Sequence, residues 1–253
     1  MKNSNFTNKI YYATLSTLIR PFRYTMERSI VIANSKFTMS RVLSYLKLKS
    51  YVVYPPVNVT PYLSLACIND HKEDIVVTVG RFSPIKNYEA ILKVAQKLPE
   101  ITFYIIGGTN SKRSLQYYNK IKRLSDGIDN LKLLSNCDLN DKISILQRAK
   151  IYLHAMINEH FGISIVEAMA AGLVPIVHKS GGPWLDILAS QNGKYGFSYR
   201  SLNEAVKLIN NLVTNNVLLQ KISKKAVERA KFFSADKYRV RFRKIINSII
   251  GKH

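Results

Sequence analysis

Residues 151–178 read IYLHAMINEHFGISIVEAMAAGLVPIVH. A short apolar run, Ile151–His154, precedes a loop with a glycine, and apolar residues at helical spacing follow over Ile163–Ala171. Gly172 is a residue type that commonly ends a helix, and a second β-branched run, Val174–Val177, comes directly after it. Two short strands joined by a helix predict a βαβ unit of a parallel sheet.

The same alternation of short β-branched runs and longer amphipathic stretches extends on both sides of this unit. The predicted fold class is therefore α/β, with a Rossmann-like parallel sheet covered by helices on both faces. Further strands are expected at Ile30–Ala33, Tyr51–Tyr54, Ile75–Val79, Thr102–Ile106 and Leu131–Leu134. Further helices are expected at Tyr88–Leu98, Lys112–Leu124, Asn140–Ala149, Leu202–Thr214 and Val217–Phe232.

The chain is expected to divide after the Tyr54-Pro-Pro-Val57 segment, where a polar stretch interrupts the pattern. Residues 1–66 hold two predicted strands and, within residues 1–54, up to two helices, which are too few elements for a doubly wound domain. Residues 67–253 hold the remaining strands and their helices, and they are predicted to form one Rossmann-like domain.

The composition limits the classes of partner and compartment. The 253 residues include 38 Lys and Arg against 16 Asp and Glu, a formal net charge of +22. Such a charge attracts nucleic acids, anionic bilayers and phosphorylated substrates. The two cysteines, Cys67 and Cys137, have no CxxC spacing, which fits a reducing compartment such as the cytoplasm. The most apolar window, Phe161–Val177, contains Glu167 and is expected to form a buried helix and strand rather than a bilayer span.

Two acids, Glu159 and Glu167, flank the predicted start of the helix within residues 151–178. Gly162 permits a close backbone approach there, where unpaired N–H groups and the helix dipole favour an anion such as a diphosphate. Glu159 could contact a polar group beyond that anion, and Glu167 could accept two hydrogen bonds from a diol such as ribose. On these residues alone, the simpler alternative is favoured, in which Glu167 is a helix acid at the edge of the core and Glu159 is a cap.

A second motif, Val79-Gly-Arg-Phe-Ser-Pro-Ile-Lys-Asn87, predicts a strand, a loop and the start of a helix. Arg81 and Lys86 fall beyond the carboxyl end of the strand, where open parallel sheets bind ligands. Both could stabilise the charge that develops on a leaving diphosphate. Taken alone, the alternative of two solvated cations in a basic protein is favoured. No Asp-x-Asp pair occurs, so we expect a metal-independent site in which these cations and the helix N-terminus replace the ion.

The other motifs carry weaker signals. Ser180-Gly-Gly-Pro183 fits an ordinary turn. Phe103–Gly108 is a strand that meets two glycines without the GxGxxG spacing of a dinucleotide site. His154 and His178 end predicted strands and are expected to be satisfied structural histidines, whereas His160 lies in the Glu159 loop and could contact a ligand.

In their order and spacing, these motifs resemble the family-4 retaining glycosyltransferases of GT-B fold. The resemblance rests on Gly80-Arg81 with Lys86-Asn87, and on Glu159-x7-Glu167 followed by Ala168-Met-Ala-Ala-Gly172. The longer string His154–Ile163 is similar to the branch of GDP-mannose-dependent α-1,2-mannosyltransferases of the dolichol pathway. The similarity runs from about Ile30 to the end of the chain.

The resemblance implies a role for each matching residue. Arg81 and Lys86 match the contacts to the diphosphate of the sugar donor, and Glu159 matches the acid that faces the sugar, so these three are the predicted catalytic residues. Glu167 matches the acid that binds ribose. The implied donor-binding set is Gly80, Arg81, Lys86, His160, Phe161, Gly162, Ile163, Ser164 and Glu167. No cofactor is implied, because GDP-mannose is a substrate. The configuration of the sugar would be retained, with the leaving phosphate helping to deprotonate the acceptor.

The family's N-terminal domain supplies a glycine-rich loop and the acceptor contacts, and its matching positions would lie before residue 1. Residues 1–66 then match the remnant of that domain and the interdomain crossing, and residues 67–253 the nucleotide-sugar-binding domain. The implied partners are the sugar donor, a glycan or lipid-linked acceptor and a separate N-terminal-domain chain. The cationic stretch Lys9–Arg28 adds an anionic membrane surface, at the cytoplasmic face.

Two alternatives stay open. The first is a nucleotide-sugar-binding module without catalysis, which the absence of the acceptor half would produce. The second is a basic nucleic-acid-binding protein, suggested by the net charge alone. No nucleic-acid-binding motif supports it, so nucleic acid is not an expected partner.

Overall fold

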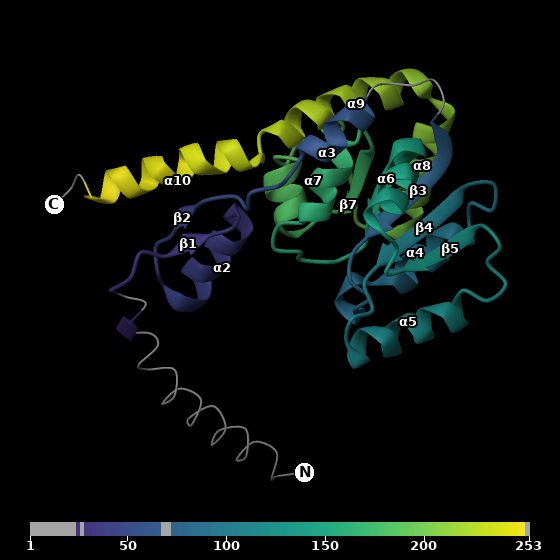
Figure 1. The fold of residues 1–253 in the computed structure, drawn as a ribbon, viewed down its shortest axis with the longest axis horizontal. Helices are drawn as coiled ribbons and strands as arrows, with labels where there is room; N and C mark the ends of the chain where they lie inside the picture. The colour runs from purple at the N-terminus through teal and green to yellow at the C-terminus, as the bar shows by residue number, and fades with distance from the viewer. Residues whose placement is uncertain (1–23, 26–27, 67–71, 251–253) are drawn as a thin grey trace, which may run out of the picture.

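The computed structural model describes residues 24–25, 28–66 and 72–250. Its larger part contains a six-stranded parallel sheet in the order β5-β4-β3-β6-β7-β8 (Figure 1). The strands are β3 (Glu73–Val79), β4 (Thr102–Gly107), β5 (Leu131–Ser135), β6 (Ala149–His154), β7 (Val174–His178) and β8 (Phe197–Tyr199). The strand order reverses between β3 and β6, and the loops that follow these two strands diverge from one point at the carboxyl edge of the sheet.

Helices cover both faces of the sheet, which confirms the α/β prediction. One core cluster joins the sheet to α6 (Leu139–Arg148) and α7 (Ile163–Ala170), and the other joins it to α4 (Tyr88–Ala95), α5 (Lys112–Leu124) and α8 (Leu202–Thr214). The helix α9 (Asn216–Lys231) contributes to both clusters. The apolar window at residues 161–177 is the buried α7 and β7, as expected.

The strand β3 explains why the central strands are continuous apolar runs. Ile75 and Val77 pack in one core cluster, and Val76 packs in the other. Successive side chains of a strand point to opposite faces, and here both faces are buried.

A small unit of two parallel strands lies beside the large sheet. It consists of β1 (Ile32–Ala33), α2 (Lys36–Leu46) and β2 (Tyr51–Val52). The chain then crosses through α3 (Thr60–Leu63) and η1 (Ser64–Ala66) to β3. Buried residues of this crossing segment, Val57, Val59 and Tyr62, belong to the core cluster around α7. The predicted boundary between residues 66 and 67 stays a prediction.

The start of α2 depends on a residue far along the chain. The Ser35 hydroxyl accepts from the N–H of Thr38, as an ordinary N-cap does. The first two amides of the helix, those of Lys36 and Phe37, donate instead to the carboxylate of Asp186 at 2.8 and 3.3 Å. Asp186 is buried in a π-helical turn, η3 (Pro183–Ile187), so the large domain fixes the small unit.

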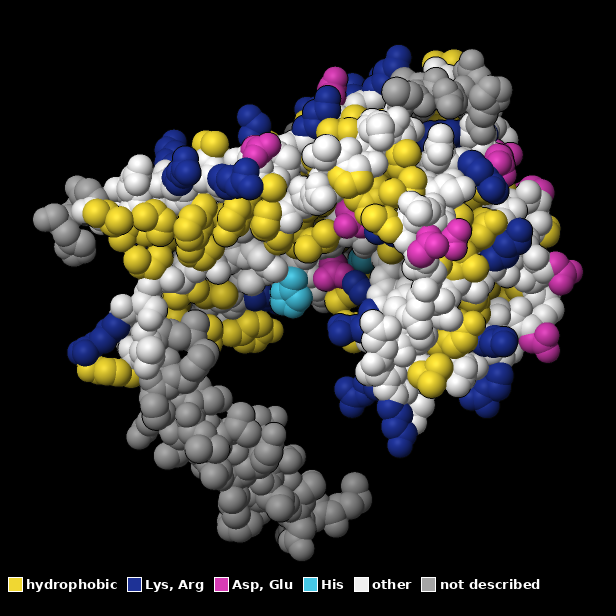
Figure 2. All heavy atoms as spheres, in the orientation of Figure 1, with side chains coloured by type: hydrophobic (Ala, Val, Ile, Leu, Met, Phe, Trp, Pro, Cys, Tyr) yellow, Lys and Arg dark blue, Asp and Glu magenta, His cyan; other side chains and the backbone are white. Residues whose placement is uncertain are grey.

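The last helix, α10 (Ala235–Ile250), extends from the large domain past the small unit (Figure 1). None of its side chains is buried, and hydrophobic side chains gather along one side of it (Figure 2). The structure thus adds α3, β8 and α10 to the expected elements, places a helix, α2, within residues 1–54, and shortens the two N-terminal strands to two residues each. Asn87 precedes α4, and its side chain makes no N-cap hydrogen bond.

Candidate functional site

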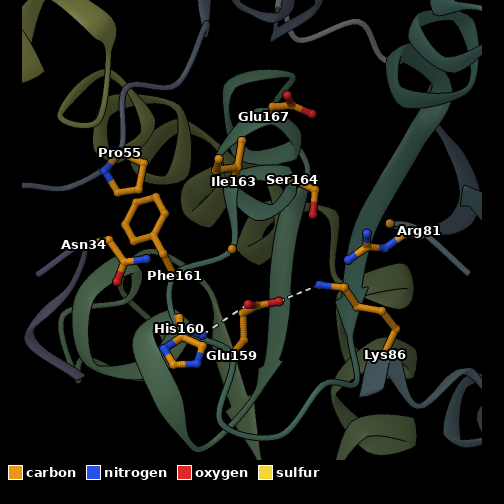
Figure 3. Close-up of a pocket in the computed structure, with 12 residues that line it drawn as sticks. Asn34, Pro55, Arg81, Lys86, Glu159, His160, Phe161, Ile163, Ser164 and Glu167 are labelled. Atoms are coloured by element: carbon orange, nitrogen blue, oxygen red, sulfur yellow. Dashed lines mark hydrogen bonds and ion pairs between the residues drawn. The ribbon is translucent and has the colours of Figure 1, made fainter. Parts of the chain in front are cut away.

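A pocket of about 390 Å³ opens at the carboxyl ends of β3 and β6, where the strand order reverses. Every predicted site residue lines it, so the structure brings the whole set together (Figure 3). Asn34 and Pro55, which the sequence did not single out, complete the wall on the side of the small unit. The lining residues are Asn34, Pro55, Gly80, Arg81, Lys86, Glu159, His160, Phe161, Gly162, Ile163, Ser164 and Glu167.

The loop after β3 is held by contacts to its backbone. The Tyr88 hydroxyl donates to the carbonyl of Gly80 at 2.7 Å, and the Gly80 amide donates to Ile106 at 2.9 Å. A Cβ on Gly107 would lie 2.1 Å from the Gly80 oxygen, so the glycine that ends β4 lets this loop pass closely. That packing accounts for a glycine in the Phe103–Gly108 motif, which showed no dinucleotide spacing.

Arg81 and Lys86 reach the pocket from this loop. The Arg81 guanidinium is exposed and forms no ion pair with any residue that the structure describes. Lys86 ends the short η2 turn (Pro84–Lys86), and Asn87 after it adopts a left-handed conformation with φ 55°. The Asn87 amide donates to the Ala155 carbonyl at 3.3 Å and so joins the loop after β3 to the loop after β6.

Lys86 forms an ion pair with Glu159, with 2.5 Å between Nζ and Oε2. The two side chains are 22% and 14% exposed, so the pair is largely shielded from solvent. Burial alone would raise the pKa of Glu159, but the hydrogen bond and charge of Lys86 hold it below the ordinary value. Glu159 is therefore a carboxylate that faces the pocket at neutral pH.

The Ser180-Gly-Gly-Pro183 segment supports the Glu159 loop, so the structure gives the predicted ordinary turn a specific role. The Gly182 amide donates to the Glu159 carbonyl at 2.8 Å. A Cβ on Gly181, whose φ is +68°, would lie 2.4 Å from that same oxygen, and one on Gly182 would lie 2.2 Å from the His160 oxygen. Only glycine fits at either position without a backbone shift.

The helix α7 begins at Ile163, and its N-cap residue, Gly162, adopts a left-handed conformation with φ 102°. No side chain caps this end, and Gly162, Ile163 and Ser164 line the pocket, so the first amides of the helix are available to a ligand there. The Ser164 hydroxyl in the first turn shares a hydrogen bond of 2.8 Å with Tyr152. Phe161 also lines the pocket, and its ring is buried and stacks on Tyr54 with 5.8 Å between the ring centroids.

Glu167 lies one turn further along α7 and is paired by a residue that sequence reasoning missed. Lys142 of α6 donates to Glu167 Oε2 at 2.7 Å and to the Tyr62 hydroxyl at 3.0 Å. Burial alone would lower the pKa of Lys142, but these two hydrogen bonds raise it above its ordinary value. Glu167 therefore reaches the pocket as one member of a charged pair.

The histidines differ from expectation in one case. His178 shares a hydrogen bond of 2.8 Å with Ser180, so it is a satisfied structural residue as predicted. His154 is buried, and its Nε2 has no hydrogen-bond partner among the described residues, which corrects the prediction of a satisfied histidine. His160 is exposed and contacts the small unit, with 3.2 Å between its Nδ1 and the Thr38 hydroxyl.

Neither a metal cluster nor a membrane-spanning helix is found among the described residues. No group of three or more His, Cys, Asp and Glu side chains there could hold a metal ion. In the same residues, no helix combines the length and apolar character that a bilayer span needs.

Comparison with known proteins identifies similar sequences. Residues 68–229 match the family model described as glycosyl transferases group 1. The chain is similar to human GDP-Man:Man(3)GlcNAc(2)-PP-Dol alpha-1,2-mannosyltransferase, with 30% identity over 84% of this chain and 47% of the relative. It is also similar to the protein of that name from Xenopus laevis, with 36% identity over 63% of this chain and 36% of the relative. The chain spans less than half the length of these curated relatives.

Solved structures with a similar fold include a glycosyltransferase from Rickettsia africae ESF-5, with a TM-score of 0.76 and 19% identity over 92% of this chain and 67% of that one. Sucrose-phosphate synthase from Thermosynechococcus elongatus gives a TM-score of 0.78 and 18% identity over 94% of this chain and 63% of that one. At this level of identity the likeness concerns the fold, and it agrees with the predicted GT-B type.

Proposed function

Since this chain belongs to the group 1 glycosyl transferases, we propose that it binds GDP-mannose and serves the transfer of mannose to a lipid-linked glycan. The proposal includes retention of configuration and membership of family 4. Its support is the named activity of the relatives, which share 30% and 36% identity with this chain. Because the chain spans less than half of either relative, the transfer is proposed for an assembly that also contains an acceptor-binding wall.

The observation that supports this proposal best is the meeting of a cationic loop, an uncapped helix N-terminus and two separate acids at one pocket. The diphosphate would bind between Arg81, Lys86 and the first amides of α7, where positive charge stabilises the leaving group. The sugar would extend toward Glu159 and the ribose toward Glu167. Glu159 would position the sugar, and the leaving phosphate would help to deprotonate the acceptor on the same face.

The identity of the sugar donor is tested by calorimetry. GDP-mannose, UDP-glucose and UDP-N-acetylglucosamine are titrated separately against the purified chain. We expect GDP-mannose to bind most tightly. Preference for a uridine nucleotide would contradict the assigned donor, and binding of none of the three would contradict the proposed function.

Transfer is expected to require an acceptor-binding domain in addition to residues 1–253. Holding sugar donor and acceptor in reacting geometry can lower the activation barrier of the transfer by roughly 7–11 kcal/mol. This effect needs an acceptor-binding wall that faces the donor pocket. A radiolabelled-mannose assay with lipid-linked oligosaccharide is run with and without a candidate N-terminal-domain partner. Strong transfer by this chain alone would contradict the need for a partner. Binding without transfer in either case would favour the non-catalytic module.

We further propose that the diphosphate site works without a metal ion, because Arg81, Lys86 and α7 supply the positive charge. Donor titration after treatment with EDTA tests this. Affinity should not change, and restoration of lost affinity by Mg²⁺ or Mn²⁺ would contradict it.

We also propose peripheral binding to an anionic membrane at its cytoplasmic face. The support is the formal net charge of +22 and the cationic stretch Lys9–Arg28, nearly all of which lies outside the described residues. Flotation with anionic liposomes should exceed flotation with neutral ones at low salt, and equal flotation would count against the proposal. Salt-sensitive DNA binding that GDP-mannose does not affect would favour the nucleic-acid alternative instead.

A further inference from the structure

The last residue of β6, His154, places an unpaired polar atom beneath the Glu159 carboxylate. Its ring stacks on Tyr152, with 6.4 Å between centroids, and its side chain is 3% exposed. Nε2 is buried without a partner among the described residues and lies 3.7 Å from Glu159 Oε2. This separation is just beyond a hydrogen bond, and a buried nitrogen without a partner is uncommon in folded proteins.

The oxygen that His154 faces is already occupied. Lys86 Nζ donates to Glu159 Oε2 at 2.5 Å. If Lys86 binds the diphosphate, as the proposed function has it, its ammonium group shares its three donors with the phosphate oxygens, and its pair with Glu159 weakens. Glu159, which is 14% exposed, would then lose its main hydrogen-bond donor in a site with little access to solvent.

His154 can supply the replacement. Closing the gap from 3.7 Å to hydrogen-bond distance needs a movement of about 0.5–1 Å, which is within side-chain adjustment. Burial and the charge of Lys86 lower the pKa of His154 to about 4, so the imidazole is neutral at physiological pH. A neutral imidazole that faces a carboxylate donates when its proton is on Nε2.

We propose that His154 is a positioning residue: when a diphosphate binds Lys86, the His154 Nε2–H donates a hydrogen bond to the Glu159 carboxylate in place of Lys86. The inference rests on the proposed function. A neutral hydrogen-bond donor differs from Lys86 in one important respect, because it fixes the carboxylate without neutralising it. Glu159 would thus keep its full negative charge for the hydroxyl groups of the bound sugar, while Lys86 serves the phosphate.

The test compares GDP with GDP-mannose in calorimetric titrations. The ratio of their two dissociation constants isolates the contribution of the sugar. In Glu159→Ala this ratio should move against GDP-mannose. His154→Phe keeps an aromatic ring but has no donor, and it should move the ratio in the same direction by roughly five- to tenfold, with GDP affinity changed less than about twofold. His154→Gln, which carries an N–H donor, should restore part of the loss.

Leu153→Ala is the matched control, because Leu153 lies in the same strand but packs in the opposite core cluster. It should leave the ratio unchanged. A wild-type ratio in folded His154→Phe, beside a shifted ratio in Glu159→Ala, would overturn the inference and leave the proposed function intact. An unshifted ratio in Glu159→Ala would overturn the inference too, and no binding of either nucleotide to the wild type would overturn the proposed function itself.

A second measurement covers the case in which His154→Phe does not fold. Imidazole ¹⁵N spectra of the wild-type chain report protonation and hydrogen bonding of Nε2 directly. Adding GDP should produce a hydrogen-bonded Nε2–H signal for His154. A spectrum of this ring that GDP leaves unchanged would overturn the inference.

Discussion

Glu167→Ala is the most informative single change in the pocket, because it removes the proposed ribose contact. One carboxylate oxygen, Oε2, is held by Lys142 at 2.7 Å, and a carboxylate retains further acceptor sites on its other oxygen. Hydrogen bonds to a charged acceptor contribute roughly 1.5–3 kcal/mol, so the loss should weaken GDP binding about 10- to 150-fold.

The same change affects the fold through the residue left behind. Lys142 would keep only its bond to the Tyr62 hydroxyl, at 3.0 Å. A buried polar group that loses its partner costs about 1–3 kcal/mol. The cost here should be near the lower end, because the Lys142 side chain is 18% exposed and water can reach it. Binding must therefore be measured on variant protein that thermal unfolding shows to be folded.

The assay is calorimetry with GDP and with 2′-deoxy-GDP. The wild type should bind GDP more tightly than the deoxy compound, and Glu167→Ala should bind the two more equally. Glu228→Ala is the matched control, since it removes the same charge from an exposed position on α9. Unchanged GDP affinity in folded Glu167→Ala would remove this residue from the site and refute the assignment.

Three further predictions concern the supporting structure. Gly182→Ala should weaken GDP-mannose binding at least about tenfold, because its Cβ would lie 2.2 Å from the His160 oxygen and the Glu159 loop must shift. Gly108→Ala, whose new Cβ would have its nearest contact at 3.8 Å, is the control. Equal affinities of the two variants in calorimetry would contradict this prediction. The pKa of His154 is lowered from 6.5 to about 4, so the unfolded chain gains this proton first as the pH falls, and up to about 3 kcal/mol of stability is lost between pH 6.5 and 4. Urea unfolding at pH 7 and 4.5 should show a smaller loss in His154→Phe, and an equal loss would argue against a buried neutral imidazole. Asp186→Ala should reduce the free energy of unfolding by about 1–2 kcal/mol and speed hydrogen exchange at the Lys36 and Phe37 amides, which lose their acceptor. Unaltered exchange at these two amides would argue against the cap.

The helices of the large domain could be predicted because their local signals agree with the packing. α5 and α8 have the predicted bounds, and each follows a serine whose hydroxyl accepts from the third amide of the helix. The strand β8 has three residues, too few to show a period of two, and only pairing with β7 defines it. α10 does carry apolar residues at helical spacing, including Tyr238, Phe242 and Ile245, so its signal was present in the sequence.

The sequence predicts which segments form the pocket, but it does not predict the contacts between their side chains. The motif places Glu159 and Glu167 around a helix start, and the strand order brings Arg81 and Lys86 to the same edge. The partner of Glu167 could not be found in this way, because Lys142 lies on a different helix, 25 residues away. Pairing of this kind depends on how α6 and α7 pack, and no spacing in the sequence encodes it.

The cap that Asp186 provides has a consequence for the order of folding. The carboxylate is 150 residues from the Lys36 amide that it accepts from, and an isolated helix of the length of α2, 11 residues, is marginal in water. The small unit therefore gains its fixed structure only after the turn at Pro183–Ile187 has formed. At 5–20 residues per second, a ribosome needs roughly 8–30 s to reach Asp186 after it has made Lys36, and a chaperone has that interval to bind the unfinished unit.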